Sequence, residues 1–381
     1  MIGHGFMGAA HSQGWRVAPR FFDLPALPEM AVLVGRTPET TRAAAEKWGW
    51  ADVSTDWREV IARPDIDIVD IVTPGESHAE IAIAALEAGK HVLCEKPLAN
   101  TVAEAEAMAD AAARAAERGI RAMVGFTYRR VPAATFARDL VAAGRLGEIR
   151  QVRASYLQDW LVDADSPLTW RLQKERAGSG ALGDIGAHAV DLAEYITGMR
   201  LATVSGVMET LVTERPLLGE AVGLSGTAAA ERGAVTVDDV ALFTGRFDSG
   251  VLGSFEASRF STGRKNALRV EIAGSLGAIA FDLEQMNTLE FYDAALPPLE
   301  QGFRTIIVTE AEHPYLSPWW PAGHMLGYEH GFSHQAKDFV EAIADGRPPL
   351  PSFADGLHVQ RVLDAVERSA AEGSAWTTTG A

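Results

Sequence analysis

The sequence predicts a two-domain α/β protein. A doubly wound parallel sheet comes first, and an α+β domain with a large, mostly antiparallel open sheet follows it. Three observations predict this arrangement. A glycine-rich turn opens the chain at residues 3–8. Short apolar runs alternate with helical patterns as far as residue 125, which is typical of parallel strands joined by helices. Beyond residue 200, apolar residues alternate with polar ones between Gly and Asp, which is typical of antiparallel strands.

Length and composition agree with this class. A chain of 381 residues corresponds to two domains at about 150 residues each. We place the boundary near residue 125, which gives a dinucleotide-fold domain, 1–125, and a substrate-binding and oligomerisation domain, 126–381. The single cysteine, Cys94, excludes an internal disulfide and a thiolate metal cage within one chain.

The charge balance narrows the class of partner. The chain has 34 Lys and Arg against 51 Asp and Glu, a formal net charge of −17, so its surface repels nucleic-acid phosphates and anionic lipids. No apolar run reaches the roughly 18 residues of a membrane span, and no signal-peptide pattern is visible. We expect a cytoplasmic protein with neither a nucleic-acid nor a membrane partner.

Local signals place the elements of the first domain. Thr37 and Pro38 are typical of an N-cap followed by proline at the first helical position, and Gly49 ends that helix. The expected order after the glycine turn is a helix, then strand 30–34, helix 38–48, a helix from 56, strand 66–72, helix 78–89, strand 91–94, helix 102–118 and strand 122–125.

Two helices of this domain have capping-box spacing at their starts. Ser77 and Glu80 stand three apart before one helix, and Thr101 and Glu104 stand three apart before the next. In such a box each side chain bonds the backbone N–H of the other residue. We therefore expect a capping box at Ser77 and Glu80, and Thr101 with Glu104 to open the helix that runs to Arg118.

The second domain begins with helix 132–144, a long strand at 149–160 and a helix at 184–195. The strands expected next are 235–247, 251–258, 268–273 and 278–282, and the last helices are 334–344 and 354–371. An open sheet with one bare face normally needs covering. We therefore expect a homo-oligomer, a dimer or a tetramer, formed through this sheet.

The glycine turn has the dinucleotide fingerprint G-x-G-x-x-G, which is typical of a Rossmann-type domain. Its glycines allow a tight turn, close approach of the backbone to a pyrophosphate, and close helix packing. The helix that follows supplies N–H groups and the positive end of its dipole. The expected cofactor contacts in this turn are Gly3, Gly5, Phe6, Met7 and Gly8.

The strand before the fingerprint is unusually short. Only Met1 and Ile2 precede Gly3, whereas a central strand normally has about five residues. Either the start lies upstream of this sequence or the first strand is truncated. We favour an upstream start, because without that strand the sheet loses its middle.

The end of the second strand bears on the choice of cofactor. An Asp or Glu is expected there if it holds the ribose 2′-hydroxyl, but the chain has Gly35 and Arg36, followed by Thr37. A missing carboxylate beside a guanidinium favours a 2′-phosphate, so we expect NAD(P) with a lean toward NADP. Alternatively, Arg36 stacks on the adenine or faces solvent. Gly35→Asp is expected to shift the preference toward NAD.

Further motifs carry a family resemblance. They are Thr73-Pro74 with His78, then Glu95-Lys96-Pro97, then the run 183–188 (GDIGAH). With the fingerprint, and in this order, they resemble the glucose–fructose oxidoreductase/inositol dehydrogenase (Gfo/Idh/MocA) family over nearly the whole chain.

The resemblance implies a nicotinamide-dependent dehydrogenase of a sugar, an anhydrosugar or a cyclitol. Segments 156–160, 166–174 and 177–184 resemble family members that oxidise a ring hydroxyl of an anhydrosugar of the levoglucosan kind. The chain departs from the family at Gly75, where Asn is usual, at His324, and in the tail 328–334.

Oxidation of an alcohol needs a hydride acceptor, a base for the hydroxyl proton and a cation or donor for the developing alkoxide. Asp184 and His188 stand four apart, so a helix brings them to one face, and imidazole has a suitable pKa for a base. The resemblance assigns catalytic roles to Lys96, Asp184 and His188. The structural alternatives are a solvated lysine and a helix-terminal acid beside a core histidine.

A polyhydroxy substrate needs convergent polar groups and aromatic faces. Tyr156, Gln158 and Trp160 alternate along a strand and so share a face, although they would equally suit the core of the sheet. The expected substrate contacts are Tyr128, Tyr156, Gln158, Trp160, Arg171, Gln173, Asp184, His188 and His324. The cofactor contacts expected beyond the turn are Arg36, Thr37, Thr73, Pro74, His78, Glu95, Lys96, Trp170 and Arg171.

We expect no metal. His330, His334 and Asp338 have helical spacing without a supporting acid between them, which suits a site rim or an oligomer contact. Two other functions share the expected fold. One is a glycosidase or lyase that oxidises its substrate transiently on tightly held NAD, and the other is a cofactor-binding regulator. The first forms no net NAD(P)H, and intact Lys96, Asp184 and His188 argue against the second.

Overall fold

The computed structural model describes residues 1–222 and 225–380, and the chain forms two compact units. Unit 1 comprises Met1–Thr127 and Gly327–Gln360, and unit 2 comprises Tyr128–Leu326 and Arg361–Ala381. This division differs from the predicted domains, 1–125 and 126–381, because helix α9 (His330–Ala344) packs against α1 (Phe6–Phe21) in unit 1. Residues 223, 224 and 381 belong to the predicted second domain and lie outside the described residues.

Unit 1 contains the predicted doubly wound parallel sheet. Ile2 forms parallel bridges with Val34 on one side and with Ile71 on the other, so it stands between two groups of paired strands. Within residues 1–127 these groups are β1 (Val32–Val34) with β2 (Asp52–Ser54), and β3 (Ile68–Ile71) with β4 (His91–Cys94) and β5 (Ala122–Val124).

Met1 and Ile2 occupy the middle of this sheet. The Ile2 N–H donates to Asp70 O at 2.8 Å, and the Gly3 N–H donates to Val34 O at 2.9 Å. The amino group of Met1 donates to Val32 O at 2.8 Å. Met1 and Ile2 therefore make the hydrogen bonds of a short central strand, with β1 on one side and β3 on the other.

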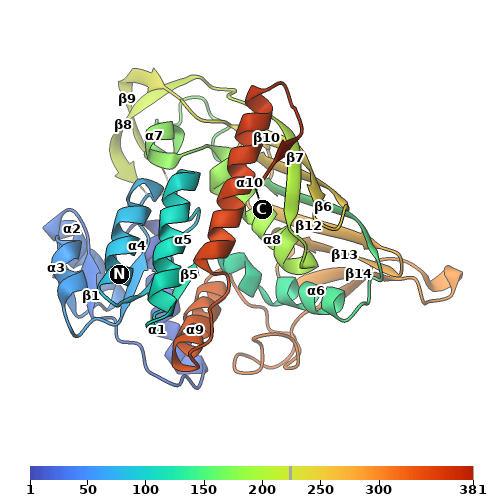
Figure 1. The fold of residues 1–381 in the computed structure, drawn as a ribbon, viewed down its shortest axis with the longest axis horizontal. Helices are drawn as coiled ribbons and strands as arrows, with labels where there is room; N and C mark the ends of the chain where they lie inside the picture. Colours follow the sequence, from blue (N-terminus) through green and yellow to red (C-terminus); the bar gives the residue numbers. More distant parts are fainter. Residues whose placement is uncertain (223–224, 381) are drawn as a thin grey trace. The chain divides into compact units, whose positions relative to one another are not determined.

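The helices of unit 1 follow the predicted signals at most of their ends. Helix α2 (Pro38–Trp48) has Thr37 at its N-cap position and ends at Gly49, whose φ of 84° suits glycine. Helix α5 (Val102–Ala116) begins at the predicted residues, where Thr101 and Glu104 cap each other reciprocally. The other helices of this unit are α3 (Trp57–Ala62), α4 (His78–Glu87) and the start of α10 (Phe353–Ala371), and Figure 1 shows α4 beside α5.

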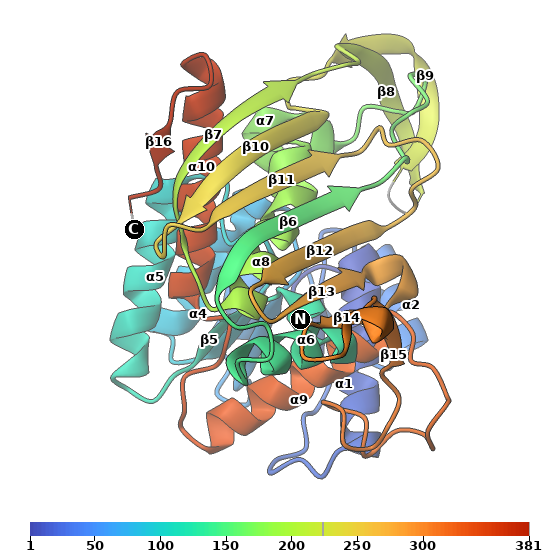
Figure 2. The ribbon, with the colours of Figure 1, turned by 90° about the vertical axis from the view of Figure 1, so that its right-hand side faces the viewer.

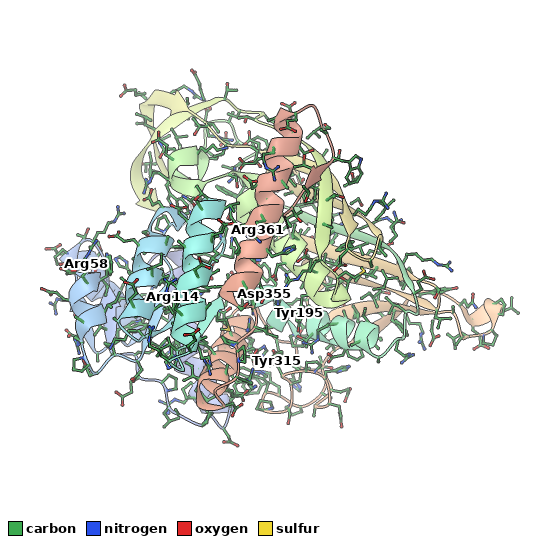
Figure 3. All side chains as sticks on the ribbon, in the orientation of Figure 1. Arg58, Arg114, Tyr195, Tyr315, Asp355 and Arg361 are labelled. Atoms are coloured by element: carbon green, nitrogen blue, oxygen red, sulfur yellow. The ribbon has the colours of Figure 1, made fainter. Side chains whose placement is uncertain are left out.

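The capping box predicted at Ser77 is wrong. A 3₁₀ turn, Gly75–Ser77, leads into α4, so the backbone of Ser77 is not extended as an N-cap requires. Its hydroxyl is 2.9 Å from Pro74 O and 2.7 Å from the Thr73 hydroxyl. Glu80 instead pairs with Arg58 of α3, which Figure 3 labels at the surface.

Unit 2 is built on the predicted large sheet. Among its described residues, nine strands pair in the order β15, β14, β13, β12, β6, β11, β10, β7, β16, and only β6 and β11 pair in parallel. Their bounds are Ile149–Leu157 (β6), Leu201–Glu209 (β7), Val240–Phe247 (β10), Leu252–Ser258 (β11), Ala267–Gly274 (β12), Gly277–Asp282 (β13), Thr288–Asp293 (β14), Arg304–Ile307 (β15) and Thr377–Thr378 (β16).

Helices cover one face of this sheet. Helix α8 (Ala187–Thr197) packs on β6, β11 and β12, and α6 (Pro132–Ala142) packs on β13 and β14. Figure 2 views the sheet from the opposite face, with α8 behind the strands. Strands β8 (Glu214–Val222) and β9 (Ser225–Ala234) pair with each other as a separate hairpin.

The prediction of one strand over residues 235–247 is wrong. The β8–β9 hairpin ends at Ala234, and β10 begins only at Val240. Between them, Asp238 accepts the N–H groups of Gly180 and Leu182 at 2.6 and 2.8 Å. Asp239 accepts those of Leu211 and Val212 at 2.8 and 3.0 Å. These two aspartates serve as caps for other segments and so interrupt the strand.

Candidate functional site

The three fingerprint glycines of unit 1 have three different surroundings. A Cβ on Gly3, whose φ is 104°, would lie 2.9 Å from Val72 O, so this turn accepts only glycine. A Cβ on Gly8 would lie 2.8 Å from Gly3 O. Gly5, the N-cap of α1, has open space in front of it. A tight turn, a close packing contact and an open approach to a helix N-terminus fit the pyrophosphate of a dinucleotide.

The neighbouring side chains of the turn differ in their contacts. Met7 packs on a buried cluster that includes Leu33 and Val72, so only its backbone faces the turn. Phe6 is 47% exposed and stacks on Tyr328 with ring centroids 6.3 Å apart. Tyr328, just before α9 and absent from the predicted site, therefore lies beside the fingerprint.

The end of β1 lacks a carboxylate, and a neighbouring segment fills that space. Arg36 and Thr37 are exposed. A Cβ on Gly35 would overlap the ring of His4 and the Thr41 hydroxyl. The predicted shift of Gly35→Asp toward NAD therefore also requires the His4 ring and the Thr41 hydroxyl to move.

His78 joins the loops that leave β3 and β4. Its Nε2 lies 2.8 Å from Thr73 O and its Nδ1 lies 3.1 Å from Pro97 O. Burial lowers the pKa of His78, although these carbonyl groups oppose the change. The ring thus holds together the two predicted cofactor loops, Thr73-Pro74 and Glu95-Lys96. Lys96 itself is half-buried, and its backbone N–H donates to Glu95 Oε2 at 3.2 Å.

A buried charge network in unit 1 escaped the sequence analysis. His11 of α1 places Nδ1 3.0 Å from both oxygens of Asp70 on β3, and Nε2 3.0 Å from Glu95 Oε1 at the end of β4. The Trp15 indole donates to Asp70 Oδ2 at 2.7 Å. A histidine three residues after Gly8 was the only signal that the sequence offered.

The network holds His11 in its charged form. Burial opposes the charge, but the ion pairs and hydrogen bonds with Asp70 and Glu95 outweigh burial and raise the pKa of His11 to about 10. Burial raises the pKa of the neighbouring Cys94 thiol well above its usual range, and the two carboxylates add to this effect. Burial also lowers the pKa of the Met1 amino group to about 6, with Asp70 opposing it.

In unit 2 the predicted helix from 184 begins with a π turn, Leu182–Gly186, which continues into α8. The carboxylate of Asp238 caps the backbone at the start of this segment. The π turn carries Asp184, and the first turn of α8 carries His188. Single π turns of this kind are frequent at functional sites.

Two tyrosines pack against His188, whose exposed fraction is 8%. The ring centroid of Tyr128 lies 4.5 Å from that of His188, and the centroid of Tyr156 lies 5.8 Å away. The two phenol oxygens are 2.9 Å apart. The predicted substrate residues Tyr128, Tyr156 and His188 thus form one cluster in unit 2.

Hydrogen bonds extend this cluster along β6. Asn266 Oδ1 accepts from the Tyr156 hydroxyl at 2.6 Å and from the Gln158 amide at 2.9 Å. The Trp160 indole donates to Gln158 Oε1 at 2.9 Å. Asn266 therefore joins two predicted substrate residues, Tyr156 and Gln158, and no sequence motif pointed to it.

A fully buried guanidinium approaches Asp184. Arg259 Nη1 lies 3.7 Å from Asp184 Oδ2, and Nη2 donates to Asp238 O at 2.9 Å. The Asp184 side chain keeps 25% of its surface exposed. Burial, together with Arg259, lowers the pKa of Arg171, while Asp184 opposes the change. Arg259, which sequence reasoning missed, thus supplies the positive charge next to Asp184.

The remaining predicted substrate residues of unit 2 lie on loops. The Arg171 guanidinium stacks on the Trp170 ring, 4.4 Å from its centroid. Gln173 is half-buried just before the short helix α7 (Lys174–Ala177). His324 is exposed, and its Nδ1 lies 2.8 Å from Pro321 O.

The histidines of α9 have protein partners in unit 1. His330 Nδ1 accepts the Gly327 N–H at 3.0 Å, and His334 is fully buried with its ring edge against Phe22. Across residues 1–222 and 225–380, no three His, Cys, Asp or Glu side chains are grouped as metal ligands. In the same part of the chain, no helix has both the length and the apolar character needed to span a bilayer.

Comparison with known proteins gives a consistent result. Residues 1–126 match the oxidoreductase family with an NAD-binding Rossmann fold (GFO_IDH_MocA), and residues 135–280 match the GFO/IDH/MocA C-terminal domain. The chain is 44% identical to levoglucosan dehydrogenase of Pseudarthrobacter phenanthrenivorans, over 98% of this chain and 96% of the relative.

Two solved structures share the whole fold. An oxidoreductase domain protein from Kribbella flavida is 63% identical with a TM-score of 0.95, covering 100% of this chain and 98% of its own. Levoglucosan dehydrogenase in complex with NADH and levoglucosan is 43% identical with a TM-score of 0.93, covering 100% of this chain and 98% of its own.

The His11 network predicts an alkaline loss of stability. Because the pKa of His11 is raised in the folded state, its stabilisation is complete below its unfolded value of about 6.5 and is lost as pH rises through about 10. The free energy of unfolding should fall between pH 7 and 10 by up to about 1.4 kcal/mol per pH unit, as urea titrations would measure.

His11→Gln should remove this slope. His91→Gln should keep it, because burial lowers the pKa of His91 and that group is neutral throughout the range. The same slope in His11→Gln and the unaltered chain would mean that the imidazolium contributes nothing.

Proposed function

We propose a function from one premise: the chain belongs to the GFO/IDH/MocA oxidoreductase family. Membership makes it an NAD-dependent dehydrogenase that acts on CH–OH groups of sugars. We propose that it oxidises, or in reverse forms, a ring hydroxyl of an anhydrosugar of the levoglucosan kind. The observation that carries this proposal is the row of hydrogen-bonded side chains next to His188, with levoglucosan dehydrogenase as a relative over nearly the whole chain in support.

The row suits a compact polyol with hydroxyl groups fixed on a rigid ring. Tyr156, Asn266 and Gln158 offer both donors and acceptors within a few ångströms of one another. The Tyr128 ring is the proposed apolar face for the C–H surface of the sugar. Trp160 packs partly on the apolar cluster around Leu161 and Leu172, and its remaining surface is the second proposed contact. A rigid bicyclic sugar loses little conformational entropy on binding to such a preformed set.

Each catalytic side chain has a distinct proposed task. His188 accepts the proton of the hydroxyl group that is oxidised, and Asp184, beside the Arg259 guanidinium, binds a neighbouring substrate hydroxyl as an ionised acceptor. Lys96 stabilises the developing alkoxide with its positive charge. When bound, NAD supplies the hydride acceptor.

The proposed cofactor contacts lie in unit 1 and on one loop of unit 2. In unit 1 they are the N–H groups at the start of α1, the loops at Thr73-Pro74 and Glu95-Lys96, and Arg36 with Thr37. His78 holds these two loops in place, since one ring nitrogen contacts the carbonyl group of Thr73 and the other that of Pro97. Trp170 and Arg171 are the proposed contacts from unit 2.

The catalytic proposal predicts a clear phenotype for His188→Asn. Cofactor affinity should be unchanged, and turnover should fall by roughly 10²–10⁴-fold, the usual contribution of a positioned acid–base group. Assays would measure net NADH formation with levoglucosan, other anhydrosugars, sugars and cyclitols, alongside NADH titration by fluorescence. Turnover without net NADH would favour the glycosidase or lyase alternative.

His313→Asn is the matched control, because it makes the same change at another histidine of unit 2, whose ring lies against Phe136. Lys96→Ala should be comparably severe, and the double variant should lose less than the product of the two effects, since groups acting in one step are not additive. Near-normal turnover in His188→Asn would make His188 a structural residue and leave Lys96 as the candidate base.

The choice between NAD and NADP is a separate proposal. We propose NAD as the working cofactor, supported by the NADH named in the levoglucosan dehydrogenase complexes. The sequence-based lean toward NADP rests on Gly35 and the exposed Arg36. If Arg36 does bind a 2′-phosphate, Arg36→Ala should weaken NADPH binding more than NADH binding in fluorescence titrations, whereas equal losses would remove that role.

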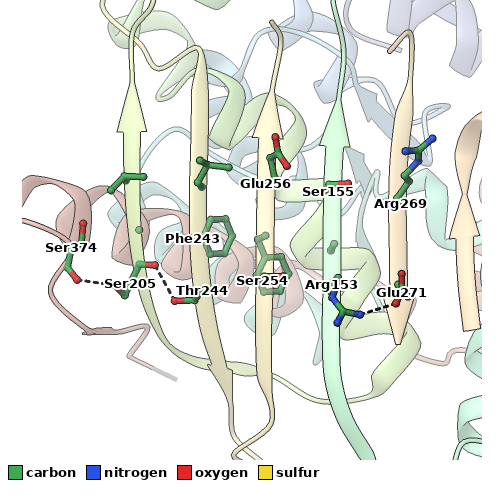
Figure 4. A pocket seen from close by; sticks show the side chains of 15 residues that line it. Arg153, Ser155, Ser205, Phe243, Thr244, Ser254, Glu256, Arg269, Glu271 and Ser374 are labelled. Carbon is green, nitrogen blue, oxygen red and sulfur yellow. Dashed lines mark hydrogen bonds and ion pairs between the residues drawn. The ribbon is translucent and has the colours of Figure 1, made fainter. Parts of the chain in front are cut away.

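The open face of the unit 2 sheet is the proposed surface for a second copy of the chain. It contains a shallow hollow of about 630 Å³ that crosses several strands (Figure 4). Leu242 of β10 and Val207 of β7 stand exposed there, and the Arg153–Glu271 ion pair lies on the same face across β6 and β12. Apolar groups next to both signs of charge suit a self-complementary contact between identical faces.

The assembly proposal predicts a mass that is a multiple of 40.8 kDa by light scattering. Leu242→Arg should shift the mass toward the monomer, because it places a charge in the middle of the face. Leu299→Arg is the matched control, since this leucine is fully exposed on a loop of the same unit. A monomer at micromolar concentration for the unaltered chain would refute the proposal.

A further inference from the structure

The space beside Gly35 holds a side chain from the glycine turn. The ring of His4, with Cδ2 and Nε2 nearest, lies where the Cβ of a larger residue 35 would stand. His4 is the second residue of the fingerprint, between Gly3 and Gly5, and is partly exposed. The end of β1 therefore has an imidazole from another segment at the place where a carboxylate is usual in this fold.

The hydrogen bonds around His4 indicate which of its two ring nitrogens carries the proton. Thr41 is fully buried, and its hydroxyl lies 2.7 Å from Thr37 O. A carbonyl oxygen only accepts, so the Thr41 proton points to Thr37. The Thr41 oxygen must then accept from His4 Nε2, which lies 3.3 Å away. This arrangement favours the tautomer with its proton on Nε2 and a lone pair on Nδ1.

We propose that His4 is the residue that selects the adenosine ribose of the cofactor, with Nδ1 accepting a hydrogen bond from a ribose hydroxyl. This inference rests on the proposed function, because it concerns how the same dehydrogenase binds NAD. An acceptor at this place does for the ribose diol what an Asp or Glu does in other members of the fold. A 2′-phosphate is itself only an acceptor, so it gains a hydrogen bond from Nδ1 only at the cost of a change in the tautomer or charge of the ring.

The first test removes the ring. His4→Ala should raise the dissociation constant of NADH by roughly 3–10-fold, the usual effect of one lost hydrogen bond. The dissociation constant of NADPH should not rise. Both are measured by fluorescence titration of the full chain. Equal affinity of His4→Ala and the unaltered chain for NADH would overturn the proposal.

Two threonines provide a matched pair. Thr41→Ala removes the group that fixes the ring proton on Nε2 and should weaken NADH binding. Thr40→Ala removes a hydroxyl that also bonds Thr37 O, at 3.2 Å, but lies on the exposed side of α2. It should leave NADH binding unchanged, and an equal loss in both variants would count against His4.

The decisive experiment exchanges the acceptor. Gly35→Asp alone should weaken both cofactors, because its side chain meets the His4 ring. With His4→Ala added, the ring is gone, and only the Thr41 hydroxyl still has to move for the carboxylate to take its place. The double variant should recover NADH affinity to within about threefold of the unaltered chain, and its NADPH binding should be lost by charge repulsion. NADH binding no better than in His4→Ala would overturn the proposal.

Failure of the inference differs from failure of the proposed function. If the unaltered chain binds neither NADH nor NADPH, the dehydrogenase proposal itself fails. If it binds NADH and His4→Ala binds NADH equally well, only the role of His4 is wrong.

Discussion

The charged ring of His11 is the constraint on which the functional part of unit 1 depends. It ties α1, which follows the glycine turn, to β3 and β4 at the same edge of the sheet. The loops that leave these strands carry Thr73-Pro74 and Lys96, and His78 joins them again beyond the sheet. Two carboxylates and one imidazolium leave a net negative charge in the core. Such a network is tolerable because every member has a partner at hydrogen-bond distance.

Glycine at Gly35 and at Gly75 shows how this chain relocates polar groups. At each position a Cβ would overlap a polar side chain from another segment, His4 in the first case and Asn100 in the second. The sequence therefore lacks the acid that is usual at position 35 and the amide that is usual at position 75. In three dimensions the volume is filled by a group from 25 or more residues away. The sequence-based preference for NADP considered only Gly35 and Arg36, because the position of His4 beside them is visible only in the structure.

Local signals and periodicity predicted the two kinds of sheet and most helices, because Thr101 with Glu104 and glycine after α2 act within one turn. They did not predict strands β2, β7, β14, β15 and β16 or the β8–β9 hairpin individually. The errors arose where distant groups compete for the same atoms. Asp238 interrupts a strand since it caps the segment before the π turn, and the Ser77 hydroxyl bonds its own preceding turn. Asn266 and Arg259 escaped for the same reason: each joins the site through strand pairing and burial, which a single sequence does not display.

The two acids at the start of α8 show how burial separates structural from chemical roles. Asp191 is 2% exposed and receives three hydrogen bonds of 2.6–3.1 Å from the Arg129 guanidinium, so its charge is fully used within the fold. Asp184 keeps a quarter of its side-chain surface, and Arg259 stands 3.7 Å away, beyond hydrogen-bond distance. Asp184 is therefore the more accessible of the two acids and has a guanidinium close to it. This exposure suits Asp184, rather than the buried Asp191, to the proposed contact with a substrate hydroxyl.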